Sequence, residues 1–205
     1  MQNNRTRHIV IAITGASGSV YGLRLIKELL QAGVRVSLIL SSAGLQVLNY
    51  ETGLDWVVDI KEQRRQVQDY FASIAIDCLA IDDFWSGTAS GSAAADAMVV
   101  IPCSMGTAGR IAAGLSNNLL ERAADVMLKE RRKLVLVPRE TPLGTIHLEN
   151  LLRLSRAGAV ILPAMPGFYH GPENMADLVN FVVGKVFDQL GISHELFTRW
   201  GEESH

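Results

Sequence analysis

The chain has 205 residues, of which 48% are hydrophobic and 20% are charged, and its formal net charge is −2 at pH 7. This composition can bury a full core, and the charge balance predicts no binding to nucleic acid or acidic membranes. No apolar run approaches the ~18 residues of a membrane span, and the N-terminus lacks the apolar region of a signal peptide. The two cysteines have no paired spacing, so we expect a reduced, cytoplasmic protein.

Apolar runs alternate with helical periodicity along the first half of the chain. Residues 8–13 predict a buried strand, and residues 18–32 predict an amphipathic helix that Gly33 ends. The elements predicted next are a strand at 34–40, a helix at 43–50, a helix near 62–73, a strand near 78–81 and a strand at 97–102. The region 54–88 is the least regular part of the sequence.

The second half continues the alternation. Its predicted elements are helices at 104–114 and 117–132, a strand at 134–137, a helix at 147–157, a strand at 159–162 and a long helix at 173–190. Strands without polar alternation, separated by helices, indicate a parallel sheet covered on both faces. The predicted fold class is therefore α/β: a Rossmann-like three-layer αβα sandwich with a mostly parallel sheet. We expect a single domain over residues 1–205, with a C-terminal helical extension.

The loop after the first strand, Thr14-Gly-Ala-Ser-Gly-Ser19, has the composition of a phosphate-binding turn. Backbone N–H groups, two glycines and hydroxyls at a helix N-terminus favour an anion, although a tight turn capped by Ser17 explains the same residues. A dinucleotide site also needs an acid at the end of the second strand, where this chain has Ser41 and Ser42. The missing carboxylate argues against NAD and favours a mononucleotide, with FMN as the natural candidate.

A second turn of this kind follows the strand at 97–102. Ser104-Met-Gly-Thr107 again places small and hydroxylated residues at the start of a helix. Ser104 or Thr107 acting as simple N-caps would also explain this segment. Both turns fall at the carboxyl edge of the predicted sheet, where ligands of such folds bind.

Three further segments carry charged or aromatic side chains. Arg122 and Lys129 are seven residues apart and share one helix face, which is typical of a solvated surface. Arg139 and Glu140 follow a strand, so they fall at the ligand edge, where the pair can contact a phosphate or move a proton. A surface ion pair in a loop explains them equally well.

The last segment, Pro166–Pro172, is a rigid loop that presents Tyr169 and His170. A tyrosine hydroxyl there can donate to a phosphate, while the role of His170 stays unassigned. The five histidines are scattered, so no metal site is predicted.

These segments together resemble the UbiX family of flavin prenyltransferases, almost from end to end. The resemblance is carried by "TGASGSVYGLRL", "IPCSMGT", "ERAADVMLKERRKLVLVPRE" and "PGFYH". It implies an enzyme that transfers a dimethylallyl group from dimethylallyl phosphate to N5 and C6 of reduced FMN, without a metal. The prenylated FMN would serve UbiD-type decarboxylases, and the subunits would form a homo-dodecamer with sites between subunits.

The resemblance also implies roles for residues of this chain. FMN would be held by Gly15, Ala16, Ser17, Ser41, Ser104, Met105, Gly106, Thr107 and Arg139. The donor phosphate and its surroundings would involve Ser90, Glu51, Tyr169, Lys185, Arg122, Lys129 and Glu140. The catalytic residues would be Glu140, which moves a proton, together with Ser17, Lys129 and Arg122. Aromatic walls would come from Phe84 or Trp85, and from Trp200.

Position 185 departs from the arginine common in the family. Lys185 keeps the charge but loses the bidentate guanidinium fork. Two other functions stay open: an FMN-dependent decarboxylase of peptidyl or phosphopantothenoyl cysteine, and a non-catalytic carrier that hands FMN to a partner. The choice between a monophosphate and a diphosphate donor also stays open.

Overall fold

A computed structural model describes residues 6–199 and residue 201. Its six strands form one all-parallel sheet in the order β3-β2-β1-β4-β5-β6. The strands are β1 (His8–Ile13), β2 (Arg35–Leu40), β3 (Ile76–Leu79), β4 (Ala97–Cys103), β5 (Lys133–Pro138) and β6 (Val160–Ile161). The helices are α1 (Ser19–Gln31), α2 (Ser42–Thr52), α3 (Ile60–Phe71), α4 (Met105–Ala112), α5 (Leu119–Lys129), α6 (Thr145–Ala157) and α7 (Met175–Leu190).

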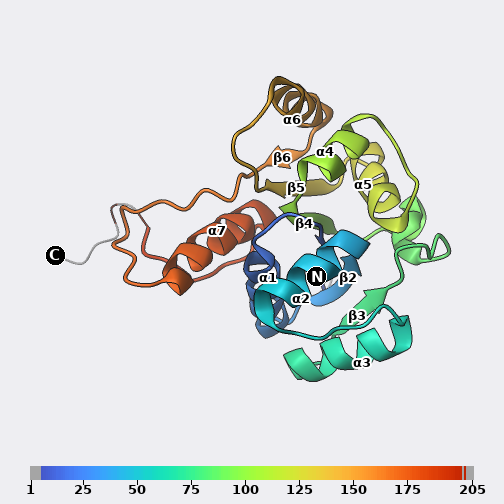
Figure 1. Ribbon diagram of the computed structural model, residues 1–205, viewed down its shortest axis with the longest axis horizontal. Coiled ribbons are helices and arrows are strands. Elements are labelled where there is room, and N and C mark those ends of the chain that lie inside the picture. Colours follow the sequence, from blue (N-terminus) through green and yellow to red (C-terminus); the bar gives the residue numbers. More distant parts are fainter. Residues whose placement is uncertain (1–5, 200, 202–205) are drawn as a thin grey trace, which may run out of the picture.

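The sheet is doubly wound around its central strand β1. Ile11 of β1 pairs with Leu38 of β2 on one side and with Val99 of β4 on the other. The chain therefore builds outward to β3, returns to the centre, and builds outward again to β6 (Figure 1). The loops after β1 and β4 meet at this reversal, which is where open α/β sheets bind ligands. The predicted Rossmann-like α/β class is confirmed, with every strand parallel.

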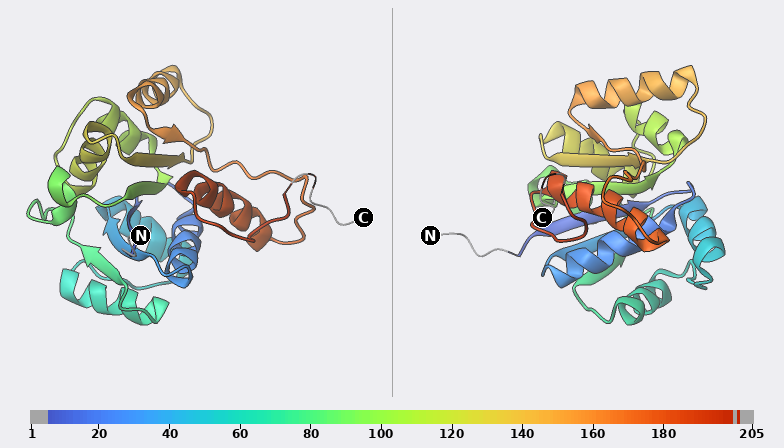
Figure 2. Two further views of the ribbon diagram at one scale, coloured as in Figure 1. Left: turned by 180° about the vertical axis from the view of Figure 1, so that it is seen from behind. Right: turned by 90° about the vertical axis from the view of Figure 1, so that its left-hand side faces the viewer.

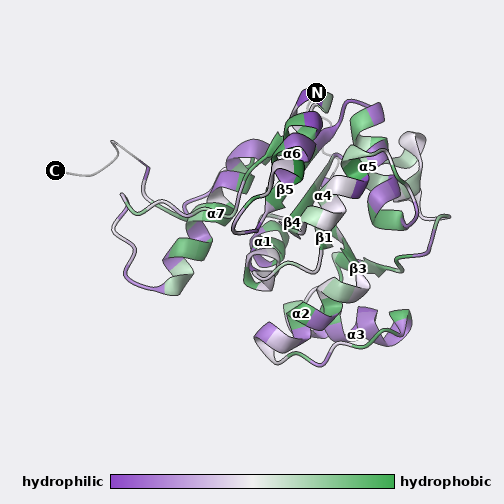
Figure 3. Cartoon of the chain, turned by 45° about the horizontal axis from the view of Figure 1, so that its top comes forward, coloured by the Kyte–Doolittle hydropathy of each residue, from purple (hydrophilic) through white to green (hydrophobic). Residues whose placement is uncertain are grey.

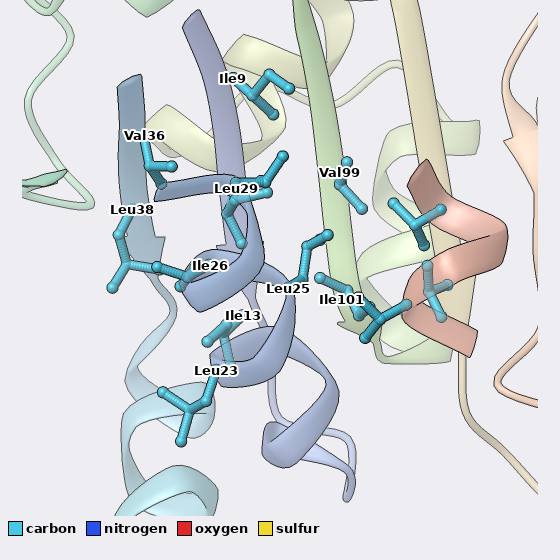
Figure 4. Close-up of a cluster of buried hydrophobic side chains, with 14 of the residues drawn as sticks. Ile9, Ile13, Leu23, Leu25, Ile26, Leu29, Val36, Leu38, Val99 and Ile101 are labelled. Atoms are coloured by element: carbon cyan, nitrogen blue, oxygen red, sulfur yellow. The ribbon is translucent and has the colours of Figure 1, made fainter. Parts of the chain in front are cut away.

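Two apolar layers separate the sheet from its helices. Alternate residues of β1 face opposite layers: Ile9, Ile11 and Ile13 pack with α1, α2, α3 and α7, whereas Val10 and Ala12 pack with α4, α5 and α6. Figure 4 shows the first layer, in which side chains of α1 lie over β1, β2 and β4. These side chains are almost fully buried, so this layer holds the start of α1 firmly at the sheet edge.

Helix α1 lies unusually close to the sheet at Gly22. A Cβ atom at this position would stand 2.7 Å from the Ile101 carbonyl oxygen and 2.8 Å from Ile13 Cδ1. Only glycine permits this approach, which fixes the distance between the first loop and the end of β4. The glycine in the "VYGLRL" part of the sequence therefore has a packing role.

Several predicted boundaries differ from the observed ones. The helix predicted at 117–132 spans α5 only, because Asn118 caps it and Arg131 (φ 54°) turns the chain out of the helical conformation. The strand predicted at 159–162 keeps two paired residues, and the strand near 78–81 lies two residues earlier. Two short 3₁₀ turns, η1 (Gly87–Ala89) and η2 (Gly91–Ala93), were not predicted.

One part of the chain stands away from the layered body. Residues 163–174, which we call the arm, run outward from β6, and α7 returns from its tip (Figures 1 and 2). Met165, Phe168 and Met175 are exposed along this stretch by 64%, 70% and 74%. Coloured by hydropathy, α7 likewise carries apolar segments out to its projecting end (Figure 3). Met165 and Phe168 of the arm and Met175 at the start of α7 are thus apolar side chains that the described part of the chain leaves exposed.

The close approach of α1 predicts the effect of a small substitution. Gly22→Ala should lower the free energy of unfolding by about 1–3 kcal/mol, because the added methyl group meets backbone and forces the helix outward. Helix propensity alone would give the opposite sign. Urea unfolding at a fixed subunit concentration measures the effect, with exposed Lys27→Ala on the same helix as the control. A Gly22→Ala protein as stable as the control would contradict the tight contact.

Candidate active site

The loops after β1 and β4 are joined through one buried hydroxyl. Thr14 is fully buried, and its Oγ1 donates to the Pro102 carbonyl at 2.8 Å and accepts from the Ser104 N–H at 2.7 Å. This bridge holds the 15–17 turn beside the start of α4. The structure therefore brings together the two turns that the sequence predicted as phosphate-binding.

Two more loops reach the same edge. The Arg139 Nε donates to the Ser17 carbonyl at 3.0 Å, and the Arg139 N–H donates to the Cys103 carbonyl at 3.3 Å. The Ser41 N–H donates to the Ile13 carbonyl at 3.1 Å. All nine residues predicted to hold FMN therefore lie on four neighbouring loops and helix starts.

The hydroxyls at this edge cap helices. Ser41 Oγ accepts from the Gly44 N–H at 3.0 Å, and Ser104 Oγ accepts from the Thr107 N–H at 3.3 Å. Capping satisfies one N–H in the first turn of each helix and leaves other N–H groups there for an anion. N-capping by these serines is therefore compatible with phosphate binding at the same turns. The interpretation of Ser17 as the cap of α1 is wrong, because the N-cap is Gly18 (φ 114°), which has no side chain to accept from the first turn.

A carboxylate from α2 occupies the start of α1. Glu51 accepts from the Gly18 N–H at 3.0 Å and from the Ser19 N–H at 2.9 Å. Partial burial raises the pKa of Glu51, but hydrogen bonds from Ser17, Ser19 and Gly18 together outweigh it and lower the pKa below its ordinary value. Glu51 is thus held as an anion and linked to the predicted catalytic residue Ser17. The contact shows that the N-terminus of α1 binds negative charge.

Two residues that the sequence analysis did not select support the α4 turn. The Arg110 side chain donates through Nη2 to Thr107 Oγ1 at 3.2 Å and through Nε to the buried carboxylate of Glu121. Glu121 is 1% exposed, and it also accepts from the Asn117 N–H at 2.9 Å. Burial raises the pKa of Glu121, but the Arg110 hydrogen bond and the other donors lower it overall. The only sequence signal was the spacing of Thr107 and Arg110, one helical turn apart.

The cationic residues of α5 form a second group, beside η1 and η2. Arg122 donates to the Ala89 carbonyl at 3.1 Å and pairs with Asp125 at 3.0 Å, while Lys129 pairs with Glu130. Ser90, which lies between the two 3₁₀ turns, bonds through its hydroxyl to Ser92 at 3.1 Å. The structure therefore brings Arg122 and Ser90 to one place. Within the chain Arg122 and Lys129 have acidic neighbours, so a phosphate would have to compete with carboxylates for them.

Tyr169 and Lys185 form a third group, where the arm meets α7. The Tyr169 ring contacts the Phe181 ring edge-on at 5.6 Å, and Lys185 Nζ lies 5.6 Å from the centre of that same ring. His170 stacks on Phe181 at 5.2 Å, and neither of its ring nitrogens has a hydrogen-bond partner among residues 6–199 and 201. The two residues predicted to grip the donor phosphate therefore gather around one phenylalanine.

The remaining predicted residues are exposed. Glu140 lies on the loop after β5 and accepts from the Thr141 N–H at 3.0 Å. Phe84 and Trp85 are 46% and 98% exposed, so they form no wall within this chain. Trp200 lies outside the described residues.

The described part of the chain shows neither a metal-binding cluster nor a membrane-spanning helix. Over residues 6–199 and 201, no three His, Cys, Asp or Glu side chains are grouped so that they could bind a metal ion. No helix in the same part of the chain is both long and apolar enough to cross a membrane.

The fold and the loop edge are those of a flavoprotein, and the sequence profile of the Flavoprotein family matches residues 1–187. The chain is 53% identical over 195 residues to the flavin prenyltransferase UbiX of Halalkalibacterium halodurans, covering 94% of this chain and 93% of that protein. It is 50% identical to UbiX of Pseudomonas aeruginosa over 199 residues, with 95% and 94% coverage. The chain belongs to the UbiX flavin prenyltransferase family.

Solved structures agree with this family. A crystal structure of AnUbiX (PadA1) in complex with FMN and dimethylallyl pyrophosphate superposes with a TM-score of 0.87 at 39% identity, covering 98% of this chain and all of that one. A dodecameric FMN-dependent UbiX-like decarboxylase from Escherichia coli O157:H7 gives 0.81 at 41% identity, with 91% and 96% coverage. The peptidyl-cysteine decarboxylase EpiD gives 0.55 at 17% identity, so it shares the fold alone.

The Glu51 contact predicts a pH-dependent contribution to stability. Glu51→Gln should lower the free energy of unfolding by about 0.5–1 kcal/mol, because the helix start loses its anion. Since the folded-state pKa is lowered, the full difference is expected above the ordinary glutamate pKa of about 4.3. It should disappear as the pH falls through the lowered value. Urea unfolding of both proteins across this range measures it, with exposed Glu149→Gln as the control. A difference that does not vary with pH would contradict the ionic contact.

Proposed function

We propose that this chain is a flavin prenyltransferase that transfers a dimethylallyl group from dimethylallyl phosphate to N5 and C6 of reduced FMN. The observation that carries the proposal is the meeting of four polar loops at the sheet's reversal point, joined by Thr14 and Arg139. We further propose a single domain over residues 1–205 with α7 and the tail as its C-terminal extension, located in the cytoplasm. The product would be delivered to a UbiD-type decarboxylase.

The residues at the loop edge fit FMN. Glu51 already neutralises the start of α1, so the N–H groups at the starts of α2 and α4 are those left for the FMN phosphate. Ser41 and the Ser104–Thr107 turn would hold it there. Arg139, tied to the Ser17 carbonyl through Nε, keeps its other guanidinium nitrogens for the flavin. These contacts support one phosphate and one ring system, which is the chemistry of a mononucleotide.

The donor phosphate would be met by the other two groups. Arg122 and Lys129 lie on α5, whereas Tyr169 and Lys185 lie where the projecting arm meets α7. We propose that subunits assemble, as in the dodecameric E. coli relative, so that the arm and α5 of neighbouring copies complete the site. The exposed apolar side chains Met165, Phe168 and Met175 support this assembly, because an interface would bury them. Phe84 and Trp85 could form an aromatic wall only in the same way.

Prenyl transfer requires that the negative charge of the leaving phosphate be neutralised. Lys129, Arg122 and Lys185, with the Tyr169 hydroxyl, would supply preorganised donors, which is the role of magnesium in other prenyltransferases. Aromatic faces would stabilise the allyl cation that develops as the carbon–oxygen bond breaks. Reduced FMN supplies the nucleophile. Glu140, exposed at the same edge as Arg139, would transfer a proton, and Ser17 lies beside Arg139, whose Nε donates to the Ser17 carbonyl.

An anaerobic mass measurement tests this function. The protein is mixed with reduced FMN and dimethylallyl phosphate, and the mass of the extracted flavin is measured by mass spectrometry. We expect a gain of one C5 unit with the unaltered chain. Glu140→Gln should lower turnover by about 100-fold or more while FMN still binds, because it removes the proton-transfer group. Exposed Glu149→Gln serves as the matched control.

Three results other than the expected ones would each lead to a different conclusion. Flavin of unchanged mass would contradict prenyl transfer and favour a carrier that only binds FMN. Release of carbon dioxide from a cysteinyl substrate would favour the decarboxylase alternative. Full turnover by Glu140→Gln would remove that residue from the mechanism without affecting the assignment of the reaction.

A further inference from the structure

The segment after α7 folds back along that helix. We call residues 192–199 the strap. Two of its side chains contact Asp188 of α7. Arg199 Nη2 donates to Asp188 Oδ1 at 2.6 Å, and His194 Nε2 lies 3.2 Å from the same oxygen. His194 Nδ1 accepts from the Leu196 N–H at 3.2 Å, so Nε2 carries the proton that Asp188 accepts. The His194 side chain is 3% exposed. The strap is therefore a fixed part of the structure.

The strap places an aromatic ring beside Lys185. Phe197 packs on Phe181 with 5.0 Å between ring centres, and Lys185 Nζ lies 5.2 Å from the Phe197 centre. The same Nζ is 5.6 Å from the centre of Phe181 and 3.8 Å from Asp188. Two rings and one carboxylate thus surround the ammonium group. Asp188 lies closer to Arg199 than to Lys185, so it orients the Lys185 ammonium group but neutralises only part of its charge.

A glycine in α7 makes this contact possible. A Cβ atom at Gly184 would stand 2.5 Å from Phe197 Cε1 and 2.7 Å from His194 Cε1. Glycine inside a helix is unfavourable compared with alanine, so its presence needs a compensating reason. The close seating of the strap on α7 supplies one.

We propose that the strap is a positioning device for Lys185, with Phe197 and Gly184 as its positioning residues. A lysine ammonium sits on a flexible four-carbon stem and lacks the rigid fork of arginine. Contact with the Phe197 and Phe181 faces restricts that stem and holds the charge in one place, so less conformational freedom is lost when a phosphate binds. This inference rests on the proposed function, in which Lys185 meets the phosphate of the prenyl donor.

Steady-state kinetics with dimethylallyl phosphate on the full chain, with reduced FMN, test the proposal. Phe197→Leu and Gly184→Ala should each raise KM for the donor about fivefold, with kcat and FMN affinity nearly unchanged, because a cation–π contact is lost. Phe197→Tyr, which keeps the ring, should restore most of the affinity lost in Phe197→Leu. Thr198→Ala, an exposed change in the same strap, is the matched control and should behave as the unaltered chain. Lys185→Ala is the reference for complete loss of the ammonium group.

Amide hydrogen exchange gives a structural readout that does not depend on activity. Gly184→Ala should speed exchange over 192–199, because the methyl group displaces Phe197 and His194, and leave β1 and β4 protected. If Lys185→Ala raises the donor KM but Phe197→Leu does not, the strap proposal is overturned while the proposed function stands. If Lys185→Ala itself leaves KM unchanged, the role of Lys185 in the proposed function fails, and the strap proposal with it.

Discussion

The arrangement of the candidate site depends on the buried hydroxyl of Thr14. It spans the reversal point of the sheet by donating to the Pro102 carbonyl and accepting from the Ser104 N–H, with no exposure to solvent. Without the hydroxyl the part-buried Ser104 N–H would lose this partner, which is costly, whereas the Pro102 carbonyl still accepts from the Thr14 N–H at 3.3 Å. The Thr14 side chain therefore ties the first loop directly to the α4 turn. Gly22, which lets α1 approach β4, also helps to set the distance between the first loop and the end of β4.

The three groups of candidate residues differ in how the fold holds them. The loop edge is fixed by backbone contacts among neighbouring parallel strands, as expected for a cradle that must match one phosphate. Arg122 is paired with Asp125 of its own helix, and Lys129 is paired with Glu130, which directly follows that helix. Tyr169 and Lys185 depend on ring contacts around Phe181. A rigid cradle with separate, less constrained cationic groups suits a reaction in which one ligand stays bound and a second phosphate leaves.

Most of the fold could be predicted from the sequence because its signals are local. The apolar run at 8–13 and the periodicity of 18–32 give β1 and α1 almost without error. The site was predictable only as far as strand order places loop residues at one edge. The Glu51 contact with the start of α1 and the Arg110–Glu121 pair link distant parts of the chain, and no local pattern marks such contacts. The alternative in which Ser17 caps α1 is wrong for a related reason, since Gly18 takes the left-handed conformation that ends the loop.

The FMN affinity of Thr14→Val, compared with Thr14→Ser, tests the central claim most directly. Valine keeps the shape of threonine but removes the bridging hydroxyl, whereas serine retains it. Removing a buried partner costs about 1–3 kcal/mol. We therefore predict a dissociation constant raised about tenfold or more in Thr14→Val and nearly unchanged in Thr14→Ser, with both proteins folded by circular dichroism. Equal FMN affinity in the two variants would contradict the account, because the loops would then hold their positions without the bridge.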